Sequence, residues 1–264
     1  MSKLQLVIVS LAVVLLGVLY FGFDTTTKKQ SEVKQSTAKT IESTGIQTLL
    51  NAAKSTLTAE QLINIQALEQ AVNKNSNEQS TKVESLKKLS GSWFDYKHPA
   101  IAGHYAEEIA EILGDESSWS IAGTTYALGI KQSGEDKIRS YCTGRAVKAF
   151  ENAISLNPSN IDHQLNLAIC YTDIPPKDNP MKGILMLVNL NKEYPDHVGV
   201  LTNLGRLGIQ TGQFEKAIGR LEKAYALESE NPQIVCLLAD AYKGAGKTEE
   251  AMSFASKCQS FSNN

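Results

Sequence analysis

The sequence predicts an all-α fold, an α-solenoid of about five helical hairpins preceded by a single N-terminal transmembrane helix. Three observations lead to this prediction. An uncharged apolar run opens the chain, one spacing recurs through its C-terminal two thirds, and the apolar residues of each recurrence share a helical face. The composition agrees, because 264 residues with 42% hydrophobic and 20% charged side chains are typical of one or two globular domains.

Charge and cysteine content exclude several classes of protein. The chain carries 26 Lys and Arg against 28 Asp and Glu, a net charge of -2. Nucleic-acid binding depends on clustered cations that neutralise phosphates, so this balance predicts no nucleic-acid partner. Four cysteines are too few for a disulfide scaffold.

The first element is the apolar segment Leu4–Phe23, which contains no charged residue. About 20 helical residues span the hydrocarbon core of a bilayer, so residues 1–23 are predicted to form a membrane anchor. A cleaved signal peptide would need small residues at the end of the run, and Leu19–Phe23 lacks an A-x-A-like step. A core helix of a soluble protein would show a polar face at this length, and Leu4–Phe23 shows none.

The orientation of the anchor stays open. The N-terminal amine and Lys3 lie on one side, and Lys28, Lys29, Lys34 and Lys39 lie on the other. The larger number of Lys residues after the run favours a C-terminal domain on the inner side of the membrane. The short basic segment before the run instead resembles an uncleaved export signal, which favours the outer side.

Residues 24–40 are rich in Thr, Lys, Gln and Ser and predict a polar tether. Residues 41–80 predict a pair of helices that packs on the domain that follows. The second helix of this pair starts at a capping box, Thr58 to Gln61, and carries its apolar residues at helical spacing.

A repeated pattern occupies the rest of the chain. Its clearest instance comprises Trp119, Ala122, Gly123 and Tyr126, followed by Ala146, Phe150, Ala153 and Pro158. This pattern resembles the tetratricopeptide repeat (TPR) family, whose unit is a helical hairpin of about 34 residues. The resemblance implies a TPR domain over residues 83–264, with units at about 83–115, 116–160, 161–197, 198–231 and 232–264.

Small residues recur where the two helices of each hairpin cross, so that the backbones can approach closely. They are Ser90, Gly123, Ala168, Gly205 and Ala239, opposite Ala102, Ala146, Gly183, Ala217 and Ala251. Stacked hairpins form a solenoid with a concave groove lined by the first helices, and a generic helical bundle is the alternative. Two units carry extra residues, about eleven near Gly134–Tyr141 and about three around Pro175 and Pro176.

No catalytic constellation is present, so the chain is predicted not to be an enzyme and to need no cofactor. Ala241–Thr248 satisfies a relaxed P-loop pattern, but a P-loop requires a preceding strand, and Gly246 falls in a hairpin turn. The histidines show no metal-binding spacing. Free, buried thiols are expected for the cysteines, with a Cys236–Cys258 disulfide as the alternative if the domain lies outside the cytoplasm.

The partner-binding site is predicted on the first-helix residues that lie off the packed stripe. They are Lys87, Thr124, Asp162, Ile169, Thr202, Arg206, Gln210, Gln233, Asp240 and Lys243. A polar lining of both signs suits an extended or helical segment of another protein. Asn166 and Asn203 resemble the asparagines of chaperone-binding TPR clamps, but the clamp's lysines have no counterparts here.

The resemblance therefore implies a membrane-tethered TPR scaffold or adaptor, similar to single-pass TPR proteins of the bacterial inner membrane. The alternative is an assembly factor or chaperone for an unfolded client, similar to the anchored TPR proteins of cytochrome c maturation. A nucleotide-binding enzyme that uses Lys247 and Thr248 is the remote alternative. The identity of the partner is left open.

Overall fold

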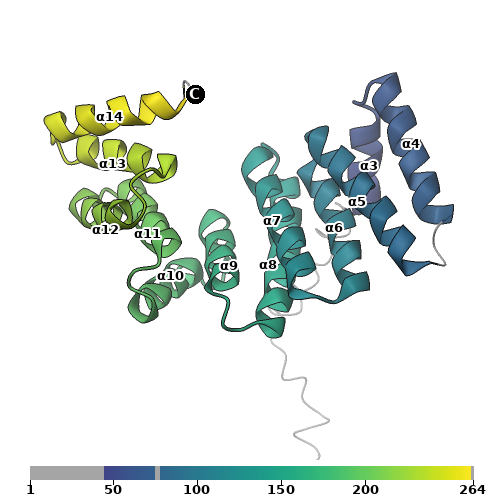
Figure 1. Ribbon diagram of the computed structural model, residues 1–264, viewed down its shortest axis with the longest axis horizontal. Helices are drawn as coiled ribbons and strands as arrows, with labels where there is room; N and C mark the ends of the chain where they lie inside the picture. The colour runs from purple at the N-terminus through teal and green to yellow at the C-terminus, as the bar shows by residue number, and fades with distance from the viewer. Residues whose placement is uncertain (1–44, 75–77, 263–264) are drawn as a thin grey trace, which may run out of the picture. The chain divides into compact units, whose positions relative to one another are not determined.

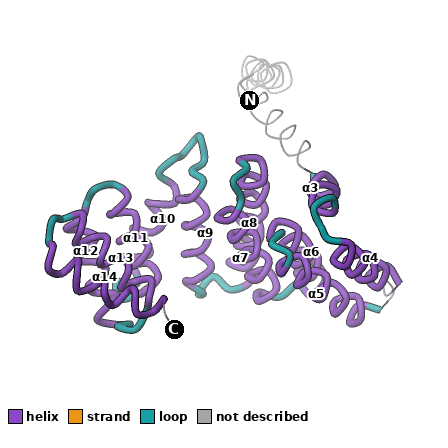
Figure 2. The backbone as a smooth tube through the Cα atoms, turned by 90° about the horizontal axis from the view of Figure 1, so that it is seen from above, coloured by secondary structure: helices purple, strands orange, loops and turns teal. Residues whose placement is uncertain are grey.

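The computed structural model describes residues 45–74 and 78–262, and every regular element in these ranges is an α-helix, as predicted (Figures 1 and 2). Two helices come first, α3 (Ile46–Lys54) and α4 (Ala59–Lys74). Five helical pairs follow: α5 (Gln79–Asp95) with α6 (Pro99–Leu113), α7 (Glu116–Gln132) with α8 (Asp136–Leu156), α9 (Ile161–Asp173) with α10 (Lys182–Glu193), α11 (Val198–Gln210) with α12 (Phe214–Leu227), and α13 (Pro232–Gly244) with α14 (Thr248–Ser262). The five pairs extend from Gln79 to Ser262, and α5 begins a few residues before the first predicted unit.

Two predicted segments, the anchor at Leu4–Phe23 and the tether at residues 24–40, lie outside the described residues. Among the helices that are described, none combines the length and the apolar composition needed to cross a membrane. Contacts divide the chain into two units, Met1–Thr48 and Leu49–Asn264, and the five helical pairs all belong to the second.

Glycine closes the last two hairpins. Gly212 and Gly246 adopt positive φ angles of 72° and 75° between the helices of their pairs. The residue after each glycine then donates its backbone N–H to a carbonyl inside the first helix, Gln213 to Gly208 and Lys247 to Tyr242, at 2.8 and 3.0 Å. This left-handed ending satisfies carbonyls that the helix leaves free and reverses the chain within a few residues.

Close approach at the crossing points explains the small residues. A Cβ at Gly123 would lie 2.7 Å from the Phe150 ring, and one at Gly205 would lie 2.5 Å from Leu221. A Cβ at Gly183 would lie 2.6 Å from the Ala168 carbonyl oxygen, an atom of the facing backbone. Side chains at these positions would force the two helices of a hairpin apart.

Apolar clusters join the third, fourth and fifth hairpins. One unites α11 to α14 around Leu221 and Leu238, and another unites α9, α10 and α11 around Leu187 and Leu204. First helices also contact the first helices of adjacent units, α7 with α9, α9 with α11 and α11 with α13. Within the Leu49–Asn264 unit these first helices therefore form a continuous row, the surface on which the partner-binding site was predicted.

The extra residues of two units have different structures. In the second unit most of them belong to a helix, because α8 begins at Asp136 and runs for 21 residues. In the third unit they form the irregular connection between α9 and α10, which contains Pro175 and Pro176 and is drawn as a loop in Figure 2.

Candidate partner-binding groove

The row of first helices carries two adjoining hollows. The first, of about 520 Å³, is lined by the C-terminal part of α7, the start of α8 and residues of α9, α11 and α13. The second, of about 500 Å³, is lined by residues of α9 and α11 and by the connections that precede α11 and α13. Asn203 and Gln233 line both, so the two hollows form one continuous surface, hereafter the groove.

Four of the ten predicted residues line the groove, namely Asp162, Thr202, Arg206 and Gln233. Thr202 is only 3% exposed, and its hydroxyl donates to the Val198 carbonyl at 2.8 Å. Thr202 therefore forms part of the wall of the groove and offers no free donor to a ligand. The other six are placed elsewhere: Ile169 packs against the core of α9 to α11, and Lys87, Thr124, Gln210, Asp240 and Lys243 are exposed outside both hollows.

The first hollow is basic. Lys131, Arg139 and Arg206 supply three cations, and Asp173 is the one carboxylate among the described residues that line it. Arg206 donates to Asp173 at 3.4 Å, and Arg139 lies 3.7 Å from Asp136 on the same helix. Lys131 is exposed and forms no ion pair with another described residue, so its charge is available to a ligand.

The second hollow is acidic. Asp162, Asp196 and Glu228 supply three carboxylates, and no Lys or Arg of the described chain lines it. Asp196 pairs with Lys223, which lies outside the hollow, at 2.8 Å. Asp162 lies 3.5 Å from His197 and keeps 69% of its side chain exposed. We name these two parts of the groove the basic hollow and the acidic hollow.

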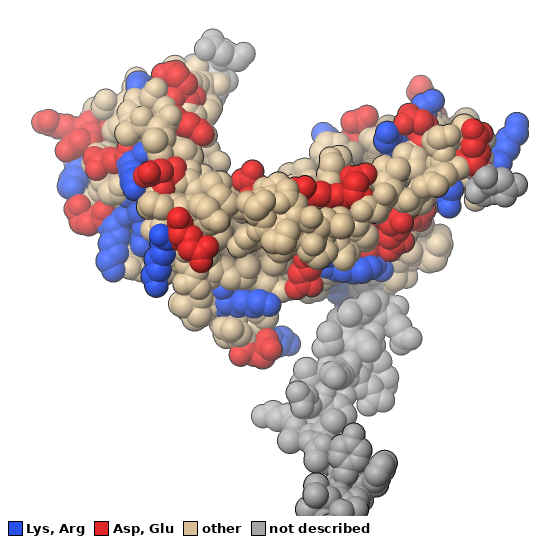
Figure 3. Space-filling model, turned by 60° about the horizontal axis from the view of Figure 1, so that its bottom comes forward, with Lys and Arg blue, Asp and Glu red and all other residues tan. Residues whose placement is uncertain are grey.

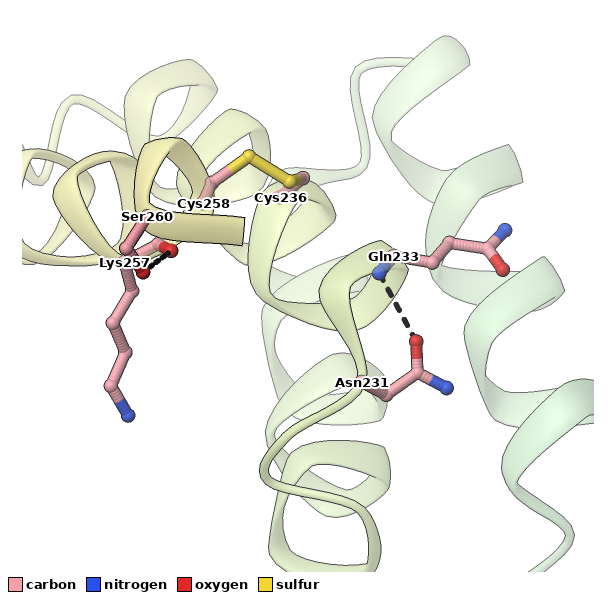
Figure 4. The surroundings of a disulfide bond; sticks show 6 residues. All are labelled: Asn231, Gln233, Cys236, Lys257, Cys258 and Ser260. Carbon is pink, nitrogen blue, oxygen red and sulfur yellow. Dashed lines mark hydrogen bonds between the residues drawn. A yellow bond between two sulfur atoms is a disulfide. The ribbon is translucent and has the colours of Figure 1, made fainter. Parts of the chain in front are cut away.

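Two amides lie where the hollows meet. Asn203 donates to the Gly199 carbonyl at 2.8 Å and accepts from Arg206 at 3.4 Å, so it orients the guanidinium. Gln233 stands on the first turn of α13, which the side chain of Asn231 caps by accepting from the Gln233 backbone N–H at 3.1 Å. The side-chain amide of Gln233 makes no hydrogen bond within the described residues, and in Figure 4 it points away from the neighbouring disulfide.

Five charged residues of the groove were not predicted from the sequence: Lys131, Arg139, Asp173, Asp196 and Glu228. Glu228 and Asp173 lie at or just after helix ends, and Arg139 stands on a second helix, so a search restricted to the middle of first helices omits them. Lys131 follows Thr124 by two turns on α7 and could have been found by continuing the exposed stripe of that helix to its end.

The cysteine prediction was wrong for two of the four residues. Cys236 on α13 and Cys258 on α14 form a disulfide with their Cα atoms 5.0 Å apart (Figure 4). It was the alternative at the sequence level, and the close approach of two antiparallel helices makes it possible. Cys142 and Cys170 are free and buried, and burial raises the pKa of both thiols to about 12.

Comparison with known proteins agrees with the hairpin architecture. Residues 209–257 match a family model described as tetratricopeptide repeat, a segment that runs from the end of α11 into α14 and includes both glycine turns. The segment 209–257 is therefore assigned to the tetratricopeptide repeats. No curated protein matches the sequence.

The fold is similar to that of a solved TPR structure. A thermophilic TPR protein of Thermus thermophilus is 16% identical over 67% of this chain and 89% of its own, with a TM-score of 0.50. BtubC of P. vanneervenii matches at 16% identity over 77% and 91% of the two chains, with a TM-score of 0.48. MamA of Desulfovibrio magneticus matches at 17% identity over 69% and 95%, with a TM-score of 0.46. At 16% identity the likeness to the Thermus protein concerns the fold alone.

The P-loop-like segment has a structural role in this TPR protein. Ala241 to Gly244 belong to α13, so a helix occupies the place of the strand that a P-loop requires. Lys247 forms an ion pair with Glu215 of the preceding unit at 2.9 Å. Lys247, the residue that a P-loop would use to bind phosphate, is therefore paired with the preceding unit.

Two polar clusters outside the groove connect TPR units. Glu107 on α6 is 3% exposed and accepts from the Tyr126 hydroxyl at 2.9 Å and from Arg145 and Lys148 at 3.1 Å. Burial is the main cause of a raised pKa at Tyr126. Because every oxygen of Glu107 has a partner on α7 or α8, this cluster stabilises the packing of three helices.

The second cluster surrounds Glu116, the first residue of α7. Asn157 and Asn160 donate to its carboxylate at 2.9 and 2.7 Å, and the His163 ring lies 2.6 Å away. The hydrogen bonds from Asn157, Asn160 and His163, in that order, hold the pKa of Glu116 below its ordinary value. The cluster joins the second TPR unit to the third.

Proposed function

We propose that this TPR protein is a non-catalytic scaffold that holds an extended, polar segment of a partner protein in the groove. The observation that carries the proposal is that residues selected by their position in the repeat, Asp162, Arg206 and Gln233, line one continuous pair of hollows. Helices fix the positions of these side chains, so the polar groups are pre-organised for a ligand, which lowers the entropic cost of binding.

The polarity of the groove argues for a hydrophilic ligand. Charged and amide side chains predominate in the lining of both hollows. On the face drawn in Figure 3, acidic and basic side chains are interspersed, and no field of one sign covers it. A solvated segment with side chains of both charges suits this lining better than the hydrophobic stretches of an unfolded client, so we favour a scaffold over a chaperone.

We further propose that the chain is anchored in a bacterial inner membrane through Leu4–Phe23, with the TPR domain on the oxidising side. The uncharged run supports the anchor. The Cys236–Cys258 disulfide supports the side, because disulfides persist outside the cytoplasm and are rare within it. The two remaining cysteines are buried, so no exposed free thiol is available for unwanted cross-linking in that compartment.

Site-specific photo-cross-linking in native membranes tests the scaffold function. A photoreactive phenylalanine analogue replaces Gln233 in one strain and Asn189, an exposed amide on the second helix α10, in another. We expect an adduct with a partner protein from position 233 and none from position 189. Equal adducts from the two positions, or none from position 233, would contradict a groove that binds partner proteins.

Membrane fractionation and acid trapping of thiols test the location. After cells are quenched in acid and alkylated, Cys236 and Cys258 should be protected from the alkylating reagent until a reductant is added. A chain that carries Cys236→Ser and Cys258→Ser is the control for this signal. Alkylation of both cysteines without reductant would show a reducing compartment, and recovery of the chain in the soluble fraction would disprove the anchor.

A further inference from the structure

The two hollows of the groove carry opposite net charge, and this difference limits what can bind there. The inference rests on the proposed function and narrows its ligand. Three cations against one carboxylate line the basic hollow, and three carboxylates with no described Lys or Arg line the acidic hollow. Because Asn203 and Gln233 belong to both, one extended segment that crosses the boundary contacts the two fields in succession.

The charges that face a ligand are those without a strong partner inside the groove. Lys131 is exposed and unpaired among the described residues, and it sets the sign of the basic hollow. Asp162, 69% exposed, faces only the His197 ring at 3.5 Å. Glu228 accepts a hydrogen bond from the neutral side-chain amide of Asn231 at 2.8 Å, and no cation of the described residues pairs with it. Each hollow therefore retains an uncompensated charge of its own sign.

We propose that the groove selects a bipolar segment of a partner protein, in which acidic and basic side chains are separated into two adjacent blocks. The acidic block lies on the basic hollow and the basic block on the acidic hollow. The free side-chain amide of Gln233, at the boundary, donates to or accepts from the backbone of the segment where its charge changes sign. A segment of the same composition with alternating charges would place like charges together in both hollows, which lowers its affinity.

Synthetic peptides and the full chain purified in detergent test the proposal by fluorescence anisotropy. The peptides are an Asp block joined to a Lys block in either chain direction, an alternating Asp–Lys peptide of equal composition, and a neutral Ser–Asn peptide. We expect at least one block peptide to bind about tenfold more tightly than the alternating peptide, and the difference to shrink at high salt. Equal binding of block and alternating peptides would overturn the proposal.

Charge reversal in the protein identifies the hollows. Lys131→Glu and Asp162→Lys should each weaken the block peptide by about threefold to tenfold, while Lys87→Glu, a reversal on α5 outside both hollows, should not. Thermal melts verify that the three variants are folded. If Lys131→Glu acts no more strongly than Lys87→Glu, or if no charged peptide exceeds the neutral one, the bipolar ligand is refuted. Cross-linking at position 233 decides the proposed function independently of both results.

Discussion

Replacing Gly183 with alanine is the most direct test of how each hairpin packs. The new Cβ would lie 2.6 Å from the Ala168 carbonyl oxygen and 2.7 Å from the Thr172 backbone nitrogen, whereas real Cβ atoms essentially never approach within 3.0 Å. Both atoms belong to the backbone of α9, so no side-chain rotation relieves the overlap. The α9–α10 crossing must widen by at least about 0.4 Å.

Widening this crossing disturbs the cluster that contains Ala168, Leu187 and Leu190, all of them buried. Overpacking of this kind costs about 1 to 3 kcal/mol. For a chain of this size each kcal/mol corresponds to about 2 to 4 °C, so the melting temperature should fall by about 2 to 12 °C. Hydrogen exchange should also accelerate first in α9 and α10, because stability in a stacked-repeat protein is largely local.

Gly219→Ala is the matched control. Gly219 lies inside α12, and a Cβ there would meet nothing within 4 Å. Alanine should therefore stabilise α12 by up to about 1 kcal/mol through helix propensity alone. Circular dichroism melts of the full chain compare the two variants. If Gly183→Ala melts at or above the temperature of the unsubstituted chain, the close crossing of α9 and α10 is incorrect.

Three further predictions concern stability. Glu107 is 3% exposed and pairs with two cations, so Glu107→Gln should lower the free energy of unfolding in urea by about 1 to 3 kcal/mol. Lys148 is half exposed, so Lys148→Gln should lower it by less than about 1 kcal/mol. Equal losses would contradict the difference in burial. Hydrogen bonds from Asn157, Asn160 and His163 lower the pKa of Glu116 from 4.5, so the carboxylate stabilises the fold fully above pH 4.5 and loses this effect as the pH falls through the lowered pKa. Glu116→Gln should therefore reduce the fall in melting temperature at acidic pH. An unchanged fall would argue against the cluster. The Cys236–Cys258 disulfide joins residues 22 positions apart, so its reduction should lower the free energy of unfolding of the α13–α14 hairpin in urea by about 3 kcal/mol. The reductant should have no effect on a chain in which serine replaces both cysteines.

Local signals were sufficient to predict the architecture from the sequence. The positions of Gly123, Gly183 and Gly205 identified the helix crossings, because close backbone approach excludes larger side chains. The ends of two first helices could also be predicted, since Gly212 and Gly246 adopt the left-handed conformation that ends a helix. These features depend on contacts within one hairpin, which the repeat spacing encodes directly.

The composition of the groove could be predicted only in part, because it depends on contacts between units. Position in the repeat identified Asp162, Arg206 and Gln233, which lie on the exposed side of their own helices. It gave no information on Lys131, which reaches the basic hollow because α7 continues for 17 residues and contacts α9. The repeat spacing located the insertion in the second unit near Gly134–Tyr141, but it did not indicate that most of these residues extend α8.

The disulfide connects the stability of the last hairpin to the groove. Within this hairpin, α14 has no fully buried side chain among its described residues. The first turn of α13 belongs to the same hairpin and supplies Gln233 to the groove. Asn231, which caps α13, lines the acidic hollow. The covalent link between Cys236 and Cys258 holds α14 against α13 one turn beyond Gln233. The Cys236–Cys258 disulfide therefore stabilises the hairpin that supplies part of the groove wall.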